Sequence, residues 1–364
     1  MSVIYPDCDI ATPALLVDYA MMQHNIAKMA EIGRQLGVAI RPHTKTHKCP
    51  QISRMLVQAG AAGICSATLS EAEVMAAYGI ENILITRMVV GSAKIKRLLS
   101  LSKQITVAVV TDSMVNAEEL AAHAAAEQTM LTVLIELNVG NDRCGMEPNS
   151  SELLRVAQFI SLNPWLHFGG LQGYAGHTPL MPDPELKKIA VDSADQLGLS
   201  SKRMLEEHDI EVPSLTGGAS GTCLQTGVSG YTELQPGSYV TMDSEYSKIV
   251  GDLFLPALTM LTTVISKPSP QWVIVDAGGK SLSVDHGPAT VKGRPNLHYH
   301  FVGDEYGKIE DIHGEPVPFE IGDQIELFPS HGCTTINLHD QLHIMNSNQQ
   351  VEFVWPVAAR GRVQ

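Results

Sequence analysis

The sequence has few aromatic residues, no paired cysteine motif and no long apolar run, and the last two absences each exclude a class of protein. Aromatic side chains make up 5% of the 364 residues and charged ones 18%, whereas apolar residues reach 44%. A chain of this composition can bury a large core, which excludes disordered, collagenous and coiled-coil proteins. The most apolar stretches, such as 253–265, are interrupted by Pro and Thr and are shorter than the ~20 residues that span a membrane. We therefore expect no membrane partner.

Basic residues are also scarce, with 25 Lys and Arg against 39 Asp and Glu, which gives a formal charge of −14. That sign opposes the capture of nucleic acid, so we expect no nucleic-acid partner. The first 20 residues lack the basic and apolar regions of a secretory signal, and we expect a cytoplasmic protein. No CxxC pair occurs, so the cysteines are expected to be buried thiols rather than disulfides: Cys8, Cys49, Cys65, Cys144, Cys223 and Cys333.

Short β-rich runs alternate with longer amphipathic stretches from residue 14 to about 220. The helix candidates cover residues 51–59, 70–78, 93–102 and 184–209. Eight strand candidates in under 240 residues predict an α/β barrel of the TIM type over residues 11–243. The strand candidates begin at Ala14, Ala39, Ala62, Asn82, Ile105, Leu131, Leu166 and Ser214.

After about residue 240 the pattern changes to short apolar runs separated by Gly, Pro and Asp, without helical periodicity. These runs are YSKIV, LTTVISKP, WVIVDAGG, QIELFP, QLHIMN and VEFVWPVAARG. They predict a second, all-β domain made of residues 244–364 together with residues 1–10.

Active sites of α/β barrels lie at the carboxyl ends of the strands, which directs attention to RPHTKTHK (41–48). On an extended segment Arg41, His43 and Lys45 share one face. A lysine in the barrel mouth would be desolvated and near positive charge, and both effects favour the neutral, nucleophilic amine. A merely solvated basic loop is the alternative that composition leaves open.

Seven segments in the same order along the chain resemble the D-serine dehydratase and D-threonine aldolase family. They are TPALLVD (12–18), RPHTKTHK, SATLSEAE (66–73), the E-x-N-V-G-x-x-R-x-G segment (136–145), YAGH (174–177), PGSYVTMD (236–243) and HGCTTINLHD (331–340). The family consists of fold-type III pyridoxal-phosphate enzymes with an alanine racemase-like N-terminal barrel. The resemblance implies that Lys45 carries the cofactor. Lys48 belongs to the next turn, and we expect it to be a surface or supporting residue.

The cofactor's phosphate requires backbone N–H donors on a glycine-rich loop. TGGASGT (216–222) follows the last predicted barrel strand and offers Ser220, Gly221 and Thr222. By the resemblance, Gly237, Ser238 and Tyr239 form a second phosphate-binding turn. Tyr174 and Arg143 are expected to contact the cofactor ring's hydroxyl or the substrate carboxylate. A structural bend, a half-buried tyrosine and a salt-bridged arginine are the respective alternatives.

His331 and Cys333 are separated by one residue, so on an extended segment both side chains would reach one ion, and zinc suits this pair of donors. The resemblance implies a zinc site here. D-threonine aldolases tend to have Asp in place of the Cys, which suits manganese or magnesium, and a histidine three residues after the position of His177. His298 and His300 have the same spacing as the predicted ligands, but exposed imidazoles on an edge strand are favoured for them.

The residues and the resemblance together predict β-elimination from a small D-3-hydroxy amino acid, with D-serine giving pyruvate and ammonia. Retro-aldol cleavage to glycine and an aldehyde is the alternative. A non-catalytic pyridoxal-phosphate carrier would need no β domain, and a metal-only hydrolase would survive the loss of Lys45. The fold further implies a homodimer, and Arg87 is a candidate specificity residue.

Overall fold

The computed structural model describes residues 10–364, so the prediction that residues 1–9 join the β domain lies outside the described residues. The chain divides into two compact units. The sheet unit contains the residues up to Lys28, Thr46–Gln51 and Ser238–Gly361, and the barrel unit contains Met29–Lys45, Ile52–Gly237 and Arg362–Gln364. Among residues 10–364, none of the helices is both long and apolar enough to cross a membrane.

The barrel unit is built on eight parallel strands, and the predicted α/β barrel is confirmed. They are hydrogen bonded in the order β2-β9-β8-β7-β6-β5-β4-β3, and a parallel bridge between His43 and Cys65 joins the two edges. The strands are β2 (Ala39–Ile40), β3 (Ile64–Ser66), β4 (Asn82–Ile85), β5 (Thr106–Thr111), β6 (Leu131–Glu136), β7 (Leu166–Gly173), β8 (Leu215–Gly217) and β9 (Glu233–Leu234).

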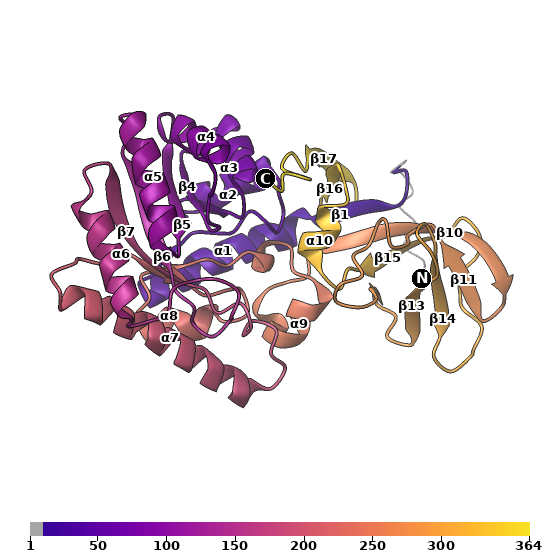
Figure 1. The fold of residues 1–364 in the computed structure, drawn as a ribbon. Coiled ribbons are helices and arrows are strands. Elements are labelled where there is room, and N and C mark those ends of the chain that lie inside the picture. Colours follow the sequence, from indigo (N-terminus) through magenta and orange to yellow (C-terminus); the bar gives the residue numbers. More distant parts are fainter. Residues whose placement is uncertain (1–9) are drawn as a thin grey trace. The chain divides into compact units, whose positions relative to one another are not determined.

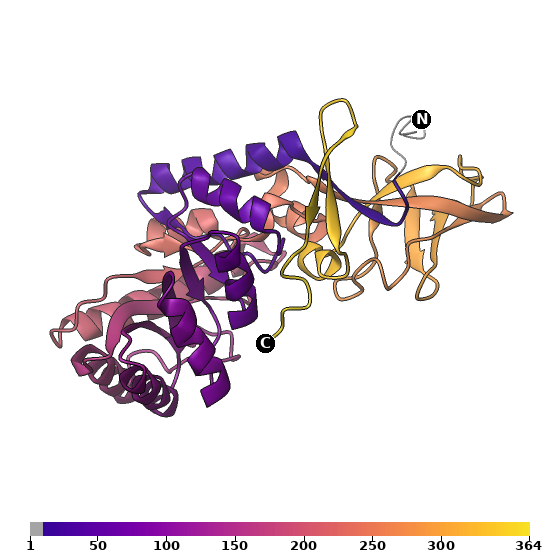
Figure 2. The same ribbon diagram turned by 90° about the horizontal axis from the view of Figure 1, so that it is seen from above.

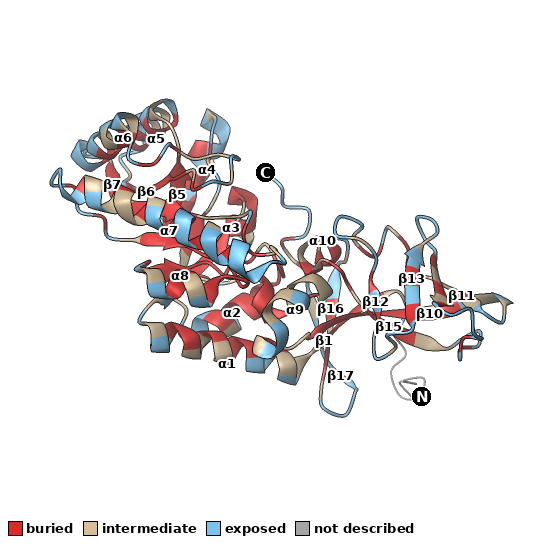
Figure 3. Cartoon of the chain, turned by 90° about the horizontal axis from the view of Figure 1, so that it is seen from below, coloured by how far each residue is buried: buried red, intermediate tan, exposed pale blue. Residues whose placement is uncertain are grey.

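Helices cover the outside of these strands, as Figure 1 shows for β4 to β7. Local side chains cap the first turns of several of them, for example Thr68, whose hydroxyl accepts the N–H of Glu71. Exposed residues follow the outward side of the longest of them, α7 (Figure 3). The four predicted helices are confirmed. The helices are α1 (Tyr19–Leu36), which begins in the sheet unit, α2 (Pro50–Gln58), α3 (Leu69–Ala77), α4 (Ser92–Ser102), α5 (Met114–Ala126), α6 (Ser151–Leu162), α7 (Pro184–Glu206) and α8 (Cys223–Ser229).

One predicted barrel strand is wrong and one was missed. The run at Ala14 forms β1 (Ala14–Asp18), which pairs with strands of the sheet unit rather than opening the barrel. The eighth barrel strand is β9, and the run at Ser214 gives the seventh in chain order. β1 misleads because it is apolar and followed directly by α1, which imitates a βα unit.

Six antiparallel strands of the sheet unit form a ring in the order β10-β11-β14-β13-β12-β15, closed by the pairing of β15 with β10. Beside β10, β1 pairs in parallel with β16, and β16 and β17 form a hairpin (Figure 2). The second all-β unit is thereby confirmed. The strands are β10 (Leu258–Ser269), β11 (Trp272–Val275), β12 (Thr290–Val291), β13 (Leu297–Phe301), β14 (Gly307–Asp311), β15 (Gln324–Phe328), β16 (Gln341–Met345) and β17 (Val351–Pro356).

The YSKIV run is not a strand but the end of helix α9 (Ser244–Val250), because Asp243 caps it by accepting the N–H of Tyr246 at 2.9 Å. A short helix, α10 (Gly332–Ile336), follows β15. Single-turn 3-10 segments occur at η1 (Ser238–Val240) and η2 (Gly251–Leu253). A domain boundary close to residue 240 stays our proposal, but residues 14–18 belong with the sheet unit.

Candidate active site

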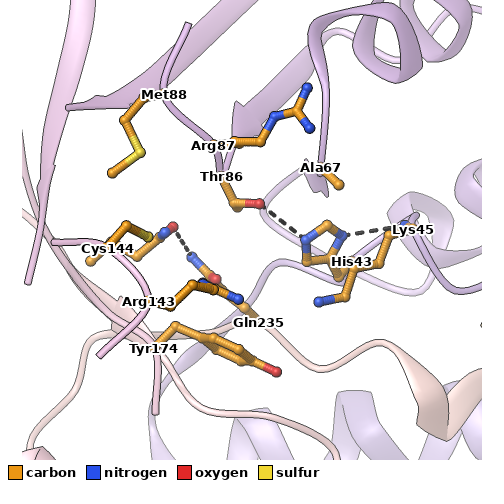
Figure 4. A pocket seen from close by; sticks show the side chains of 11 residues that line it. His43, Lys45, Ala67, Thr86, Arg87, Met88, Arg143, Cys144, Tyr174 and Gln235 are labelled. Atoms are coloured by element: carbon orange, nitrogen blue, oxygen red, sulfur yellow. Dashed lines mark hydrogen bonds between the residues drawn. The ribbon is translucent and has the colours of Figure 1, made fainter. Parts of the chain in front are cut away.

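A cavity of about 330 Å³ opens at the carboxyl ends of the barrel strands. Its walls come from residues that follow β2, β3, β4, β6, β7 and β9, so the parallel topology collects them at one edge. The volume falls within the range of small-molecule sites. Figure 4 shows its side chains, among which the predicted Lys45, Arg143 and Tyr174 come together.

Lys45 extends into this pocket from the segment after β2. Its amine lies 5.3 Å from the centre of the Tyr174 ring. In Figure 4 it points toward the space between His43 and Tyr174. The loop is fixed by His43, whose Nδ1 accepts the N–H of Lys45 at 3.3 Å while Nε2 contacts Thr86 Oγ1 at 3.1 Å. Buried His43 thus fixes the backbone from which the Lys45 side chain extends, whereas the sequence indicated it only as a neighbour on the same face.

Arg41 does not join this pocket, contrary to the prediction that it shares a face with Lys45. Its Nε donates to Glu233 Oε2 at 2.8 Å, and its Nη1 donates to Asn82 Oδ1 at 2.9 Å. β2 ends at Ile40, so the alternation expected for a longer strand does not continue through residue 45. Arg41 therefore ties the barrel strands together beneath the site.

Arg143 and Tyr174 form the side of the pocket opposite His43 in Figure 4. The guanidinium carbon of Arg143 lies 5.7 Å from the centre of the Tyr174 ring, within cation–π range. The Arg143 side chain is about half exposed, and its Nη2 lies 3.7 Å from Glu136 Oε1. Two cationic side chains thus approach one aromatic ring, an arrangement suited to a flat, anionic ligand.

The predicted phosphate-binding residues Ser220, Gly221 and Thr222 lie in the loop between β8 and α8 rather than in the helix. Both hydroxyl side chains are buried. Thr222 Oγ1 accepts the N–H of Ala219 at 3.0 Å, which leaves its own hydrogen free to be donated. A Cβ on Gly221 would lie 2.4 Å from the carbonyl oxygen of Pro179, so only glycine fits there.

Gly237, Ser238 and Tyr239 follow β9, the neighbour of β8 in the sheet. Because these strands are parallel, the segments after them leave the sheet at the same edge. Gly237 ends the barrel unit and Ser238 begins both the sheet unit and η1. The Tyr239 ring is buried and packs at 5.5 Å, centre to centre, on Phe254. Phosphate binding by these two segments stays a prediction.

Sequence reasoning did not assign the buried polar residues beneath the pocket. Glu136 at the end of β6 is 2% exposed and accepts a hydrogen bond from the amide of Gln172. Burial raises the pKa of Glu136 to about 7, against the lowering effects of Gln172 and Arg143. Gln235 in turn donates to Gln172 at 2.9 Å. The sequence held one indication of these residues, because polar residues stand at the ends of otherwise apolar strand candidates.

His331 and Cys333 lie together in the sheet unit, but not on an extended segment as predicted. His331 is the N-cap of α10, and Cys333 lies in its first turn. Burial lowers the pKa of His331, but its contact with Cys333 and the charge of Asp285 outweigh burial and raise it to about 9. Cys333 Sγ lies 3.5 Å from Thr46 Oγ1. A helical turn therefore brings the imidazole and the thiol together.

Two further residues near His331 were missed, and both precede a Gly-Pro turn. Asp285 Oδ2 accepts a hydrogen bond from His331 Nδ1 at 2.7 Å. The rings of His286 and His331 lie 4.6 Å apart, and one ligand atom from each of Asp285, His286 and His331 falls within 4.8 Å of the others. Buried Asp243 accepts the N–H of Gly332 at 2.9 Å and holds the start of α10. The carboxylate on Nδ1 leaves Nε2 as the metal-binding atom of His331.

His298 and His300 have the same spacing as the predicted ligands and lie on β13. Both alternate with buried Leu297 and Tyr299 on β13 and are exposed, as expected. His300 Nε2 pairs with Glu310 at 3.0 Å. β13 lies between β12 and β14, so the expectation of an edge strand was wrong.

The donor sets fit the two groups that the resemblance implies. Lys45 supplies an amine for an aldehyde, Arg143 a cation, Tyr174 a ring face, and the loop after β8 buried hydroxyls for a phosphate. His331 and Cys333 supply the nitrogen and sulfur donors that zinc prefers, with Asp285 as outer support.

Comparison with known proteins agrees with both units. The model of the alanine racemase N-terminal domain matches residues 17–245, and that of a putative serine dehydratase domain matches residues 257–345. The chain is 36% identical to D-threonine aldolase of an Arthrobacter species, over 98% of this chain and 94% of the relative. It is 24% identical to D-serine dehydratase of Dictyostelium discoideum, over 94% and 95%.

The crystal structure of D-threonine aldolase from Filomicrobium marinum superimposes with a TM-score of 0.93 and 34% identity, covering 98% of this chain and 97% of that one. The matches extend through both units. The chain therefore belongs to the fold-type III pyridoxal-phosphate family that joins an alanine racemase N-terminal domain to a serine dehydratase domain.

Proposed function

We propose that this chain is a pyridoxal-phosphate-dependent lyase that breaks a bond at Cβ of a small D-3-hydroxy amino acid. The observation that carries the proposal is the convergence of Lys45, Arg143 and Tyr174 in one pocket at the strand ends, with both cations within 6 Å of the Tyr174 ring centre. The relatives named above are likewise an aldolase and a dehydratase of such amino acids.

Each side chain of the pocket has a definite task in this reaction. Lys45 Nζ would hold the cofactor, and its amine would take the proton from Cα of the substrate as general base. His43 orients the backbone of Lys45, so the amine stays directed into the pocket. Arg143 binds an anionic group of cofactor or substrate, and the Tyr174 ring faces it. Pyridoxal phosphate, when bound, supplies the electron sink that makes loss of that proton possible.

Of the two bonds that could break, we propose Cβ–O, so that D-serine gives pyruvate and ammonia. His331 and Cys333 would hold the metal, whose chemistry is to assist the departure of hydroxide. Support comes from Cys333, because the resemblance associates a His-x-Cys pair with dehydration and a His-x-Asp pair with aldol cleavage. Zinc is the ion that fits this pair.

Cleavage of Cα–Cβ is the second candidate, and a specific observation favours it. The two aldolases are 36% and 34% identical to this chain, whereas the D-serine dehydratase is 24% identical. The same lysine and metal would serve that reaction, with manganese or magnesium as the alternative ion. Overall similarity thus favours the aldolase, and the metal-binding cysteine favours the dehydratase.

One product assay separates the candidates. Purified protein is incubated with D-serine, D-threonine and D-3-hydroxyaspartate, with and without chelator, and ammonia, keto acid, glycine and aldehyde are quantified. Formation of ammonia and a keto acid supports dehydration. Formation of glycine and an aldehyde supports aldol cleavage instead. Lys45→Ala is the matched inactive control. Activity that survives in Lys45→Ala, or borohydride labelling of Lys48 or another lysine in place of Lys45, would contradict the proposed site.

We also infer a homodimer and a cytoplasmic location from the family resemblance. Sedimentation of the purified protein tests the first, and fractionation of expressing cells tests the second. Metal analysis of protein purified without added ions tests zinc against manganese and magnesium.

A further inference from the structure

Beneath the cationic wall of the pocket lies a carboxyl group that the lyase reaction does not use. Glu136 is 2% exposed, and its two oxygens have different neighbours. Oε2 accepts a hydrogen bond from Gln172 Nε2. Oε1 faces Arg143 Nη2 at 3.7 Å and Cys144 Sγ at 4.0 Å. Only Oε1 therefore responds to what happens at Arg143.

A chain of hydrogen bonds through the barrel fixes which way the supporting amides point. Arg41 Nε donates to Glu233 Oε2, and the Thr216 hydroxyl donates to Glu233 Oε1 at 2.9 Å. Since Thr216 has donated its hydrogen, its oxygen can only accept, and Gln235 Nε2 donates to it at 3.0 Å. The other hydrogen of Gln235 goes to Gln172 Oε1 at 2.9 Å.

Gln172 consequently has its NH2 group turned toward Glu136 whether or not that carboxyl is charged. Oε2 stays an acceptor, and any proton on Glu136 must sit on Oε1, next to the Arg143 guanidinium. While Arg143 is free, its charge opposes such a proton. Burial favours the proton, because an isolated carboxylate is costly to desolvate.

We propose that proton binding at Glu136 is coupled to anion binding at Arg143. When an anion binds the Arg143 guanidinium, Glu136 Oε1 takes up one proton from solvent. The anion neutralises the cation that had favoured the carboxylate, so burial then decides the charge state. The proton leaves a buffer acid or hydronium ion and forms an O–H bond at Oε1, and its charge balances the added negative charge. Glu136 acts through Arg143 and is a positioning residue, not one that touches substrate.

The direction of the effect with pH follows from the groups that face Glu136. Arg143 and Cys144 come from the loop after β6, Asp112 from the end of β5, and β7 contributes only the neutral Gln172. Burial raises the pKa of Glu136 to about 7 in the free pocket. Anion binding raises it further. Proton uptake is therefore small near pH 6, where the group is already protonated, and large near pH 8.

Calorimetry measures this uptake directly. The full-length protein is titrated with D-glycerate, which has a carboxylate and hydroxyls but no amine, in buffers of different ionisation enthalpy. At pH 8 we expect about half a proton or more per bound anion, and nearly none at pH 6. The apparent dissociation constant should rise by up to about tenfold per pH unit above pH 7.

Glu136→Gln keeps the size and an acceptor oxygen, and should abolish both the uptake and the pH dependence. Asp195→Asn is the matched control, because burial also raises the pKa of Asp195, to about 6, but it lies on α7 and does not line the pocket. Proton uptake by the Asp195→Asn variant should equal that of the wild type. No uptake by the wild type at pH 8, or the same uptake in Glu136→Gln, would overturn the proposal.

If Glu136→Gln does not fold, Arg143→Gln tests the pair from the other side. It should bind D-glycerate at least about tenfold more weakly and without proton uptake, as expected when a charge-assisted contact is removed. Uptake that persists in this variant overturns the coupling. The inference depends on the pocket and not on the lyase reaction, so a negative product assay leaves it open to test, and its failure leaves the proposed reaction intact.

Discussion

His47 is predicted to make the protein lose stability as pH falls below 6.5. The side chain is fully buried, and its Nδ1 accepts the N–H of Cys49 at 3.1 Å, which places its own proton on Nε2. Nε2 has no hydrogen-bond partner among residues 10–364. Burial first, and then the charge of Lys48, lower the pKa of His47 to about 3. The folded chain thus keeps this imidazole neutral.

The size of the effect follows from linkage. Below its ordinary pKa of 6.5 the unfolded chain binds a proton that folded His47 refuses until about pH 3. Between pH 6.5 and pH 5 each of the 1.5 pH units lowers the free energy of unfolding by ~1.4 kcal/mol. At pH 5 His47 has therefore lowered it by about 2 kcal/mol. Glu136 and Asp195 act in the opposite direction, because burial raises their pKa values to about 7 and about 6 and stability from them grows as pH falls.

A difference measurement isolates His47 from those carboxyls. Urea unfolding is followed by circular dichroism at pH 7.5 and pH 5 for the wild type and for His47→Phe, which keeps a planar ring without a titrating group. Loss of the Cys49 hydrogen bond lowers the stability of the variant at both pH values, but its change between them should be about 2 kcal/mol more favourable. Exposed His208→Gln should match the wild type. Equal pH dependence in His47→Phe and wild type would refute the reasoning.

Three further outcomes are expected. Asp285→Ala should weaken metal binding about 10–100-fold in a chelator competition, because the metal-binding imidazole loses its orienting carboxylate, whereas exposed Asp304→Asn should not. Cys333→Ala should lose metal and dehydration but keep the cofactor's absorbance, and full D-serine turnover in chelator would contradict the metal's role. Gly217→Ala should lower the unfolding free energy by about 2 kcal/mol or more, and the thermal midpoint with it, because the new Cβ would lie 2.3 Å from the carbonyl oxygen of Gly173. An unchanged midpoint would show that β7 and β8 can move apart there.

The barrel was predictable from the sequence because most of its strands combine buried β-branched residues with a following amphipathic helix. β9 escaped because it has only two residues, one of which is the ion-paired Glu233. β1 was misplaced because its partners, β10 and β16, lie more than 240 residues later. Local pattern shows that a segment is a strand, but not which sheet it enters.

Within the site, the residues with distinctive chemistry were predicted and their supports were not. Lys45, Arg143 and Tyr174 share a pocket as expected. Asp285 could not be found by spacing, because it precedes His331 by 46 residues and joins it only through folding. His331 and Cys333 are in contact as predicted, but the reason differs. They meet because His331 caps a helix and Cys333 lies in its first turn, not because both lie on an extended segment.

The net charge of −14 means that the pocket must attract an anionic cofactor and substrate by itself. Arg41, which the sequence placed on one face with Lys45, is already neutralised by Glu233 at 2.8 Å. Lys45 and Arg143 remain, and Arg143 shares its charge with Glu136. Counting Lys45 as an ammonium, these three groups carry +1 when Glu136 is ionised and +2 when it is protonated. A proton on Glu136 and an anion on Arg143 therefore strengthen each other's binding, because proton uptake raises the charge of these groups from +1 to +2 when the anionic ligand is bound.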